Sequence, residues 1–330
     1  MTRTARFVFR LIVGAAFGAT LTTAAAAQID DSTVRSAREV LGADGAGRML
    51  VSLINFSSLP AVSFATFTVD APDNGRDATL QGGKIPIEFV VPFRDSDIGL
   101  QVALSVGLVD FEEPFDLPDG EGGDLTFESE KRVISGLVGG GPRLPVLFDD
   151  FYITPMIMGG IASIDNEARF FGRAAEVIDP NTELFLLNWT VDTTIIAGTP
   201  QFDYEYRNDE DWFEVWAQAT HSYVDAFNYP DEALNFKGHS DVIGGFVRYN
   251  RESDWQVWDQ PLGWHLIASN TSLAGEDASA LGFNYTFGAG GGLTIFPTAD
   301  VIPFEGARFT AQGMAGDNIT GVSLSLSLIW

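Results

Sequence analysis

Apolar residues alternate with small or polar residues from about residue 60 to the end of the chain. The pattern is clear over 98–108, where aliphatic residues occupy every second position, and again over 281–295 and 322–330. A period of two is typical of β-strands with one apolar face. It predicts about twelve strands, near 61–70, 84–94, 98–110, 125–138, 150–164, 186–206, 211–226, 240–250, 262–271, 280–296, 305–316 and 319–330.

The connections between these segments alternate in length. Those after the first, third, fifth and seventh segments are long and rich in Gly, Pro and acidic residues, at 70–83, 112–124, 165–183 and 228–238. Several others are short, at 95–97, 207–210 and 251–254, although 139–149 and 297–304 are longer. Several predicted strands reach 11 residues, whereas soluble strands average ~5–6 and tilted membrane strands need ~9–11. The pattern predicts an all-β fold, a transmembrane antiparallel up-and-down β-barrel of about 12 strands.

The second face of the predicted strands favours a membrane barrel over a soluble sandwich. It carries Gly, Ser, Thr and Asn with single charges, as a polar lumen would. Aromatic residues bracket the strand ends, where amphipathic rings meet the headgroup zone. They include Trp189, Tyr204, Tyr206, Trp212, Tyr223, Tyr249 and Trp264. A soluble secreted β protein that binds a ligand stays open as an alternative.

The first residues of the chain have the features of a secretory signal peptide. A positive region with Arg3, Arg6 and Arg10 precedes an apolar stretch and a run of small residues. We expect residues 1–27 to be removed by cleavage between Ala27 and Gln28. Residues 28–58 then form a helical lead and a candidate plug in or under the lumen, because 30–41 shows helical spacing. The barrel is expected over 59–330.

Composition excludes several classes of function. The 330 residues include 19 Lys and Arg against 45 Asp and Glu, a net charge of −26. A chain this acidic lacks the basic surface that neutralises phosphates, so we expect no nucleic-acid partner. Because it has no cysteine, disulfide frameworks, thiol catalysis and cysteine zinc sites are excluded. A hydrophobic share of 45% also argues against disorder.

The last strand ends the chain on an aromatic residue. Leu324, Leu326, Leu328 and Trp330 alternate up to the terminus, which resembles the assembly signal of bacterial outer-membrane proteins. The whole layout resembles the solitary outer-membrane autotransporter-type β-barrel domains. That resemblance implies an integral outer-membrane protein of a Gram-negative bacterium without a large passenger. It also implies outer-membrane lipid, lipopolysaccharide and the barrel-assembly machinery as partners, and leaves the oligomeric state open.

Candidate chemistry is sparse. His221 and His239 each stand directly before a serine, so in a strand the two side chains point to opposite faces and cannot form a nucleophile–histidine pair. The acidic 110–124 segment does not match a calcium-loop spacing and is interpreted as a solvated loop. We therefore expect no catalytic residue, metal or cofactor, and a small-pore or structural role. A lipid-modifying barrel enzyme is the alternative.

Lumen-facing residues are the remaining candidates for function, and they carry both signs of charge. The principal candidates are Glu88, Gln101, Glu214, Gln218, Arg248, His265, Arg308 and Gln312. Further candidates are Asn188, Asp192 and Asn284. Opposed charges in this set could pair and close the bore instead of lining an open channel.

Overall fold

The structure is a computed structural model. It describes residues 51–52, 54, 64–70, 77–93, 96–118, 124–146, 150–171, 188–208, 211–230, 232–274, 281–296 and 306–329. The expected signal peptide, its cleavage site between Ala27 and Gln28, and the 30–41 helix lie outside these residues. No helix in the described part of the chain is long and apolar enough to cross a membrane.

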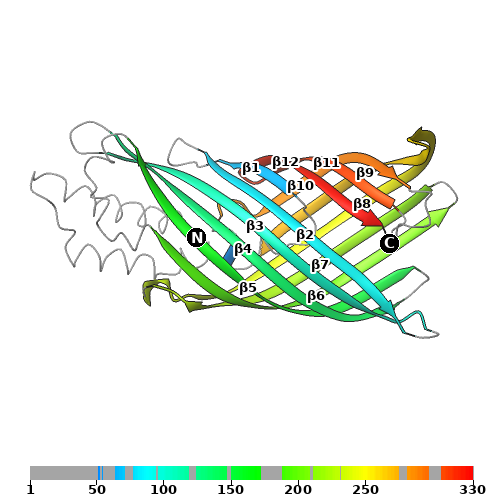
Figure 1. The fold of residues 1–330 in the computed structure, drawn as a ribbon, viewed down its shortest axis with the longest axis horizontal. Coiled ribbons are helices and arrows are strands. Elements are labelled where there is room, and N and C mark those ends of the chain that lie inside the picture. Colours follow the sequence, from blue (N-terminus) through cyan, green and yellow to red (C-terminus); the bar gives the residue numbers. More distant parts are fainter. Residues whose placement is uncertain are drawn as a thin grey trace, which may run out of the picture.

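Twelve antiparallel strands form a closed barrel, which confirms the predicted fold class (Figure 1). They are β1 (Phe64–Val69), β2 (Ala78–Pro92), β3 (Gly99–Pro118), β4 (Asp124–Pro145), β5 (Phe151–Phe171), β6 (Trp189–Asn208), β7 (Asp211–Asn228), β8 (Lys237–Val257), β9 (Gln260–Ala274), β10 (Tyr285–Ile295), β11 (Gly306–Gly316) and β12 (Ile319–Ile329). A short 3-10 helix, η1 (Glu232–Leu234), lies between β7 and β8.

Each strand pairs with its neighbours in sequence, and β1 closes the barrel by pairing with β12, from Phe64 opposite Leu324 to Val69 opposite Ile319. The wall is uneven in height (Figure 1). Strands β3 to β5 have 20 to 22 residues, whereas β10 to β12 have 11 each. We call the end where β1 leads to β2 the loop end, and the end where β2 leads to β3 the turn end.

The barrel is apolar outside and partly polar inside. Large aliphatic and aromatic side chains such as Ile85, Ile157 and Leu326 are exposed on the outer face. Buried Gln101, Asn250 and many Ser and Thr side chains occupy the alternate, inward positions. A closed barrel satisfies the backbone within the sheet, so such an outer face can meet hydrocarbon. The architecture is that of an outer-membrane β-barrel.

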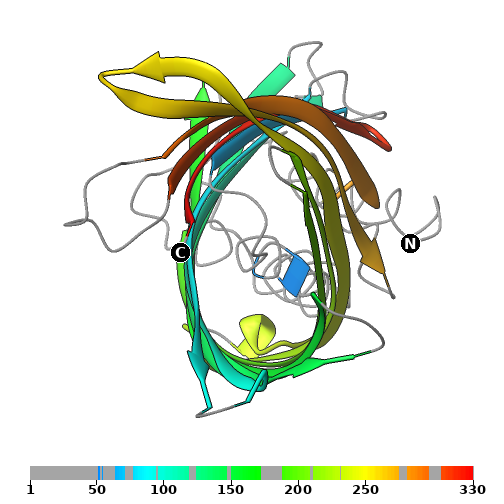
Figure 2. The same cartoon turned by 90° about the vertical axis from the view of Figure 1, so that its right-hand side faces the viewer.

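The loop-end half of the interior is filled with apolar side chains. Phe67, Leu80 and Ile164 belong to one buried cluster there, which also receives Leu234 from η1. The helical residues Val51 and Ile54 are completely buried in the same cluster, and the short blue segment that carries them lies inside the ring of strands in an end-on view (Figure 2). This half of the bore is therefore closed by hydrophobic packing.

Several strand ends differ from their predicted positions. The expected turn at 251–254 lies inside β8, and residues 139–145 of the expected 139–149 connection belong to β4. The acidic 110–118 stretch is strand rather than loop. In each case the backbone ladder continues past the point where the apolar alternation stops. Polar and glycine-rich residues extend these strands because their backbone groups find partners on tall neighbouring strands.

Candidate functional site in the barrel lumen

An ionic cluster fills the turn-end half of the interior. Its centre is Glu214 on β7, whose carboxylate accepts hydrogen bonds from Arg248 on β8 and from Arg308 on β11, the latter at 2.8 Å. The indole of Trp212 donates a further bond of 2.9 Å to the same carboxylate. Arg308 also donates to Asn250 at 3.2 Å. One carboxylate thus serves two guanidinium groups, and both arginine side chains are largely buried.

The bond between Glu214 and Arg308 crosses the lumen. Strands β7 and β11 are separated in the barrel by β8, β9 and β10, so this ion pair does not follow the wall as a neighbour pair would. Beside it, His265 on β9 contacts the hydroxyl of Thr310 on β11 at 2.9 Å. These contacts join strands that are not neighbours in the sheet, and their side chains occupy the lumen between those strands.

A second polar cluster lies on the facing wall. Gln101 on β3 donates to Glu88 on β2 at 3.0 Å and accepts from Thr154 on β5 at 3.1 Å. On β6, the amide of Gln201 donates to both carboxylate oxygens of Asp203 at 3.0 and 3.2 Å. The carboxylates of Glu88 and Asp203 in this half of the lumen therefore each accept hydrogen bonds from a neighbouring amide side chain.

The structure places the eight principal lumen candidates at inward positions of their strands. Gln101, Gln218, His265 and Arg308 are buried there, and Glu88, Glu214, Arg248 and Gln312 are half-buried. The Gln312 side chain accepts a hydrogen bond from Ser269 at 2.8 Å. The ionic cluster brings together Glu214, Arg248 and Arg308, whereas Glu88 and Gln101 belong to the second cluster.

The three further candidates do not line the lumen as a group. Asp192 occupies an outward position of β6, where it accepts bonds from Ser163 and Asn228, so its prediction as a lumen residue is wrong. Near the loop end the buried, inward face of β6 carries the apolar Trp189 and Val191, whereas its outward face carries the polar Thr190 and Asp192, so polarity no longer marks the lumen side there. Asn188 is exposed just before β6, and Asn284 precedes β10 and donates to Asp317.

Neither His221 nor His239 shares a face of the wall with the serine that follows it in sequence. As predicted, Ser222 and Ser240 are buried while His221 and His239 are exposed on the outer face. His221 contacts Asp241 at 2.7 Å and stacks on His239 with ring centroids 5.5 Å apart. In the part of the chain that the structure describes, a histidine contacts a side-chain hydroxyl in the lumen, where His265 meets Thr310.

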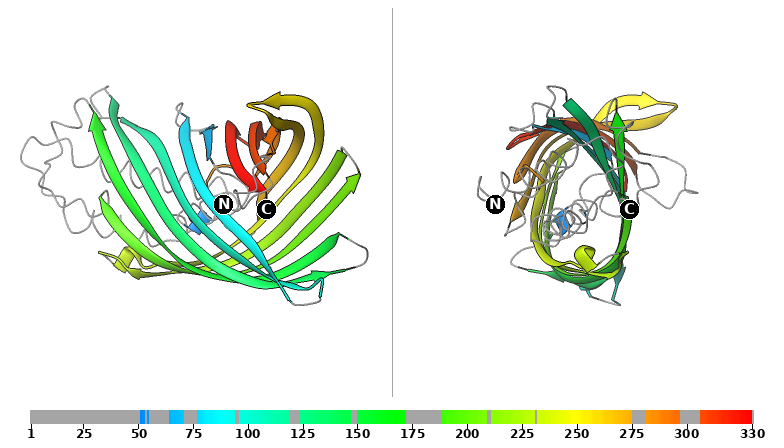
Figure 3. Two further views of the ribbon diagram at one scale, coloured as in Figure 1. Left: turned by 45° about the vertical axis from the view of Figure 1, so that its right-hand side comes forward. Right: turned by 90° about the vertical axis from the view of Figure 1, so that its left-hand side faces the viewer.

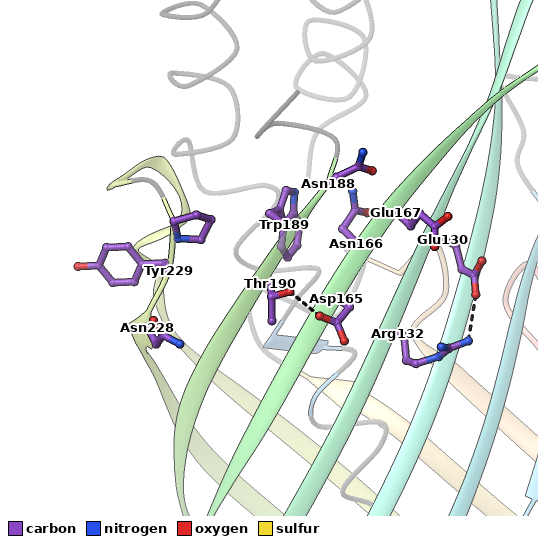
Figure 4. Close-up of a pocket in the computed structure, with 11 residues that line it drawn as sticks. Glu130, Arg132, Asp165, Asn166, Glu167, Asn188, Trp189, Thr190, Asn228 and Tyr229 are labelled. Atoms are coloured by element: carbon purple, nitrogen blue, oxygen red, sulfur yellow. Dashed lines mark hydrogen bonds and ion pairs between the residues drawn. The ribbon is translucent and has the colours of Figure 1, made fainter. Parts of the chain in front are cut away.

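A polar depression of about 620 Å³ lies at the loop end, near the upper parts of β4, β5 and β6 (Figure 4). Its lining includes a bond between Thr190 and Asp165 at 2.6 Å and an ion pair between Arg132 and Glu130 at 3.2 Å. Asp110 binds the same arginine at 2.7 Å. The described residues contain no group of three or more His, Asp or Glu placed to hold a metal ion. The lining holds three carboxylates, Glu130, Asp165 and Glu167, against the single guanidinium of Arg132, so its charges are only partly compensated.

Some members of the ionic cluster were not predicted from sequence. Asn250, Trp212 and Thr310 all complete it, yet Trp212 was assigned to the aromatic zone and the other two had no signal beyond their inward position. Of the residues in the predicted assembly signal, Leu324, Leu326 and Leu328 are exposed on the outer face of β12, and the signal itself stays a prediction. Trp330 lies outside the described residues.

No protein-family model and no curated protein matches the chain. Similar solved structures include the β-domain of the Bordetella autotransporter BrkA, with 12% identity over 80% of this chain and 94% of that one, at a TM-score of 0.46. The translocator domain of NalP from Neisseria meningitidis has 13% identity, 90% and 96% coverage and a TM-score of 0.48. The transport unit of AIDA-I from Escherichia coli has 7% identity, 88% and 99% coverage and a TM-score of 0.48. The chain thus resembles autotransporter-type barrels, a likeness that concerns the type of barrel alone.

Proposed function

We propose that this protein is a non-enzymatic, integral outer-membrane barrel whose bore is closed, and that it serves a structural or surface role instead of conducting solutes. The cross-lumen ion pair between Glu214 and Arg308 carries the proposal. A water-filled pore would keep opposed charges on separate walls, each solvated. Here the two charges meet in an ion pair between β7 and β11, which are separated by three strands of the wall.

The apolar half supports closure independently. Val51 contacts β8 closely, because a Cβ atom added at Gly238 would lie 2.8 Å from a Val51 methyl carbon. Ile54 is buried in the same cluster. An ion crossing this half would have to leave water for an apolar, packed interior, at a large cost in free energy. Two unlike barriers in series therefore close the bore.

Membrane location is supported by the outer face of the barrel. The exposed aliphatic belt matches hydrocarbon, and tall strands such as β3 carry charged residues beyond it, starting at Asp110. That arrangement fits a lipid partner with lipopolysaccharide around the charged rim. The exported state and the barrel-assembly machinery as partner follow from the signal-like N-terminus and the alternating C-terminal strand.

Fractionation tests location and activity together. The protein should be recovered in the outer-membrane fraction and should migrate differently on gels with and without boiling. The purified barrel should show no lipid hydrolysis, and His265→Ala should leave that baseline unchanged. Recovery in the soluble periplasmic fraction would overturn the membrane proposal. Lipid hydrolysis that disappears in His265→Ala would overturn the non-enzymatic one.

A further inference from the structure

The β8–β9 hairpin leaves the barrel wall at the turn end. End-on views from both sides show it bending sideways beyond the ring of strands, with its tip in yellow (Figures 2 and 3). The last pair of the ladder is Val257 with Gln260, so only Trp258 and Asp259 form the turn. The tip therefore points outward, away from the lumen and toward the surroundings of the wall.

A β-bulge accounts for this bend. The β8–β9 register runs from Ser253 opposite Leu262 directly to Gln256 opposite Pro261, so β8 carries extra residues at Asp254 and Trp255. The Ser253 hydroxyl holds the irregularity by donating to the Leu262 carbonyl at 2.7 Å. Bulges bend the strand that carries them and re-aim its side chains.

The tip displays two tryptophans. Trp255 is 61% exposed and Trp258 is 86% exposed. Trp258 has a φ of 52° and Asp259 a φ of 61°, the left-handed values that a two-residue hairpin turn of type I′ requires at both central positions. Asn, Asp and Gly are the usual residues there, and a bulky tryptophan rarely adopts this conformation. An indole displayed at such a position, at the end of a bent hairpin, is explained by a contact outside the chain.

We propose that the tip of the β8–β9 hairpin is a lipid anchor, with Trp255 and Trp258 in the headgroup zone of the leaflet at the turn end. The proposal rests on the membrane location proposed above. Indoles favour this zone because one edge is apolar and the N–H is wet. The exposed charges of Glu252 and Asp254 next to the tryptophans keep the hairpin out of the hydrocarbon. Because of the sideways bend, the hairpin extends from the lipid-facing outer wall and lies along the membrane surface.

The absence of cysteine makes a site-specific reporter straightforward. Gln256→Cys places a thiol between the two tryptophans, and Asp97→Cys is a matched exposed position in the 93–98 turn at the same end. Each full-length variant is labelled with an environment-sensitive fluorophore and reconstituted in phosphatidylcholine vesicles. Quenching by iodide, present on both sides of the vesicles, is then measured.

The label at position 256 should emit at shorter wavelength and be quenched several-fold less than the label at 97. Adding Trp255→Ala and Trp258→Ala should abolish the difference. Equal quenching at the two positions would overturn the anchor. Protection that appears only at high protein-to-lipid ratio would overturn it in favour of a second copy of the chain. Gel mobility without boiling reports barrel insertion separately, so failure of the anchor is distinguishable from failure of the membrane proposal.

Discussion

Replacing Glu214 by glutamine removes the negative charge that both Arg248 and Arg308 bind. The side chains of these two arginines are only 12% and 6% exposed, so water replaces little of the lost interaction. Removing one partner of a buried ion pair typically costs about 3–5 kcal/mol, mostly from the charge left unpaired. Glutamine keeps one acceptor oxygen, and we therefore expect a loss of about 3 kcal/mol in unfolding free energy. The two guanidinium groups should also repel and separate.

Two measurements test the expected loss of stability and the expected separation of the two arginines. Urea titration of the folded barrel in detergent, read by gel mobility without boiling, gives the change in unfolding free energy. Conductance in planar bilayers reports whether separation of the arginines opens the turn-end half. We expect a lower urea midpoint, and a rise in conductance only when the apolar half is also opened by a second substitution. The opened barrel should prefer anions because two positive charges then face the bore.

Glu130→Gln is the matched control. Glu130 also binds two arginines, Arg132 and Arg169, and its side chain is 11% exposed, but it lies at an outward position of β4. We expect the Glu130→Gln substitution to lower the stability of the barrel without changing its conductance or ion preference. If Glu214→Gln were as stable as the wild type, or if Glu130→Gln changed ion preference equally in the same double-variant background, the reasoning from a cross-lumen pair would be refuted.

Three further predictions concern packing and the membrane face. Val51→Asp, which puts a charge into the fully buried apolar cluster, should lower thermal stability and combine with Glu214→Gln to give measurable conductance. Gly292→Ala would bring a Cβ into a backbone carbonyl of β11 and to 2.7 Å from the His265 ring, so the folded yield should fall sharply, whereas Gly313→Ala, with nothing within 4 Å, should fold normally. Leu324→Arg on the exposed face of β12 should cost about 2–4 kcal/mol of unfolding free energy in lipid vesicles if it lies near the bilayer midplane.

Strand number and fold class could be predicted because apolar residues alternate with small or polar residues along the strands. The 98–108 pattern leaves one interpretation, since a register slip would put its aliphatic face into the lumen. Strand ends could not be predicted in the same way. The ladder from Asp110 to Pro118 continues opposite β4, where charged side chains mask the strand, and the glycine-rich end of β4 resembled a turn.

The alternation also predicted which residues point into the lumen, but it did not predict which of these side chains contact one another. Nothing in the sequence joins Glu214 to Arg308, which are 94 positions apart, because that contact depends on how the closed ring brings β7 toward β11. Asp192 shows the limit of alternation, since near the loop end the inward face of β6 is apolar and its polar residues stand on the outward face. The bent tip at Trp258 was missed because a bulge has no periodic signal.

The central claim is that the bore of this membrane barrel is closed in two places. Single-channel recording of the wild-type barrel in planar bilayers tests it most directly, with insertion checked by gel mobility without boiling. We predict that the inserted wild type shows no steady conductance and that the Val51→Asp, Glu214→Gln double variant does. A steady open conductance of the inserted wild type, equal to that of the double variant, would contradict the account.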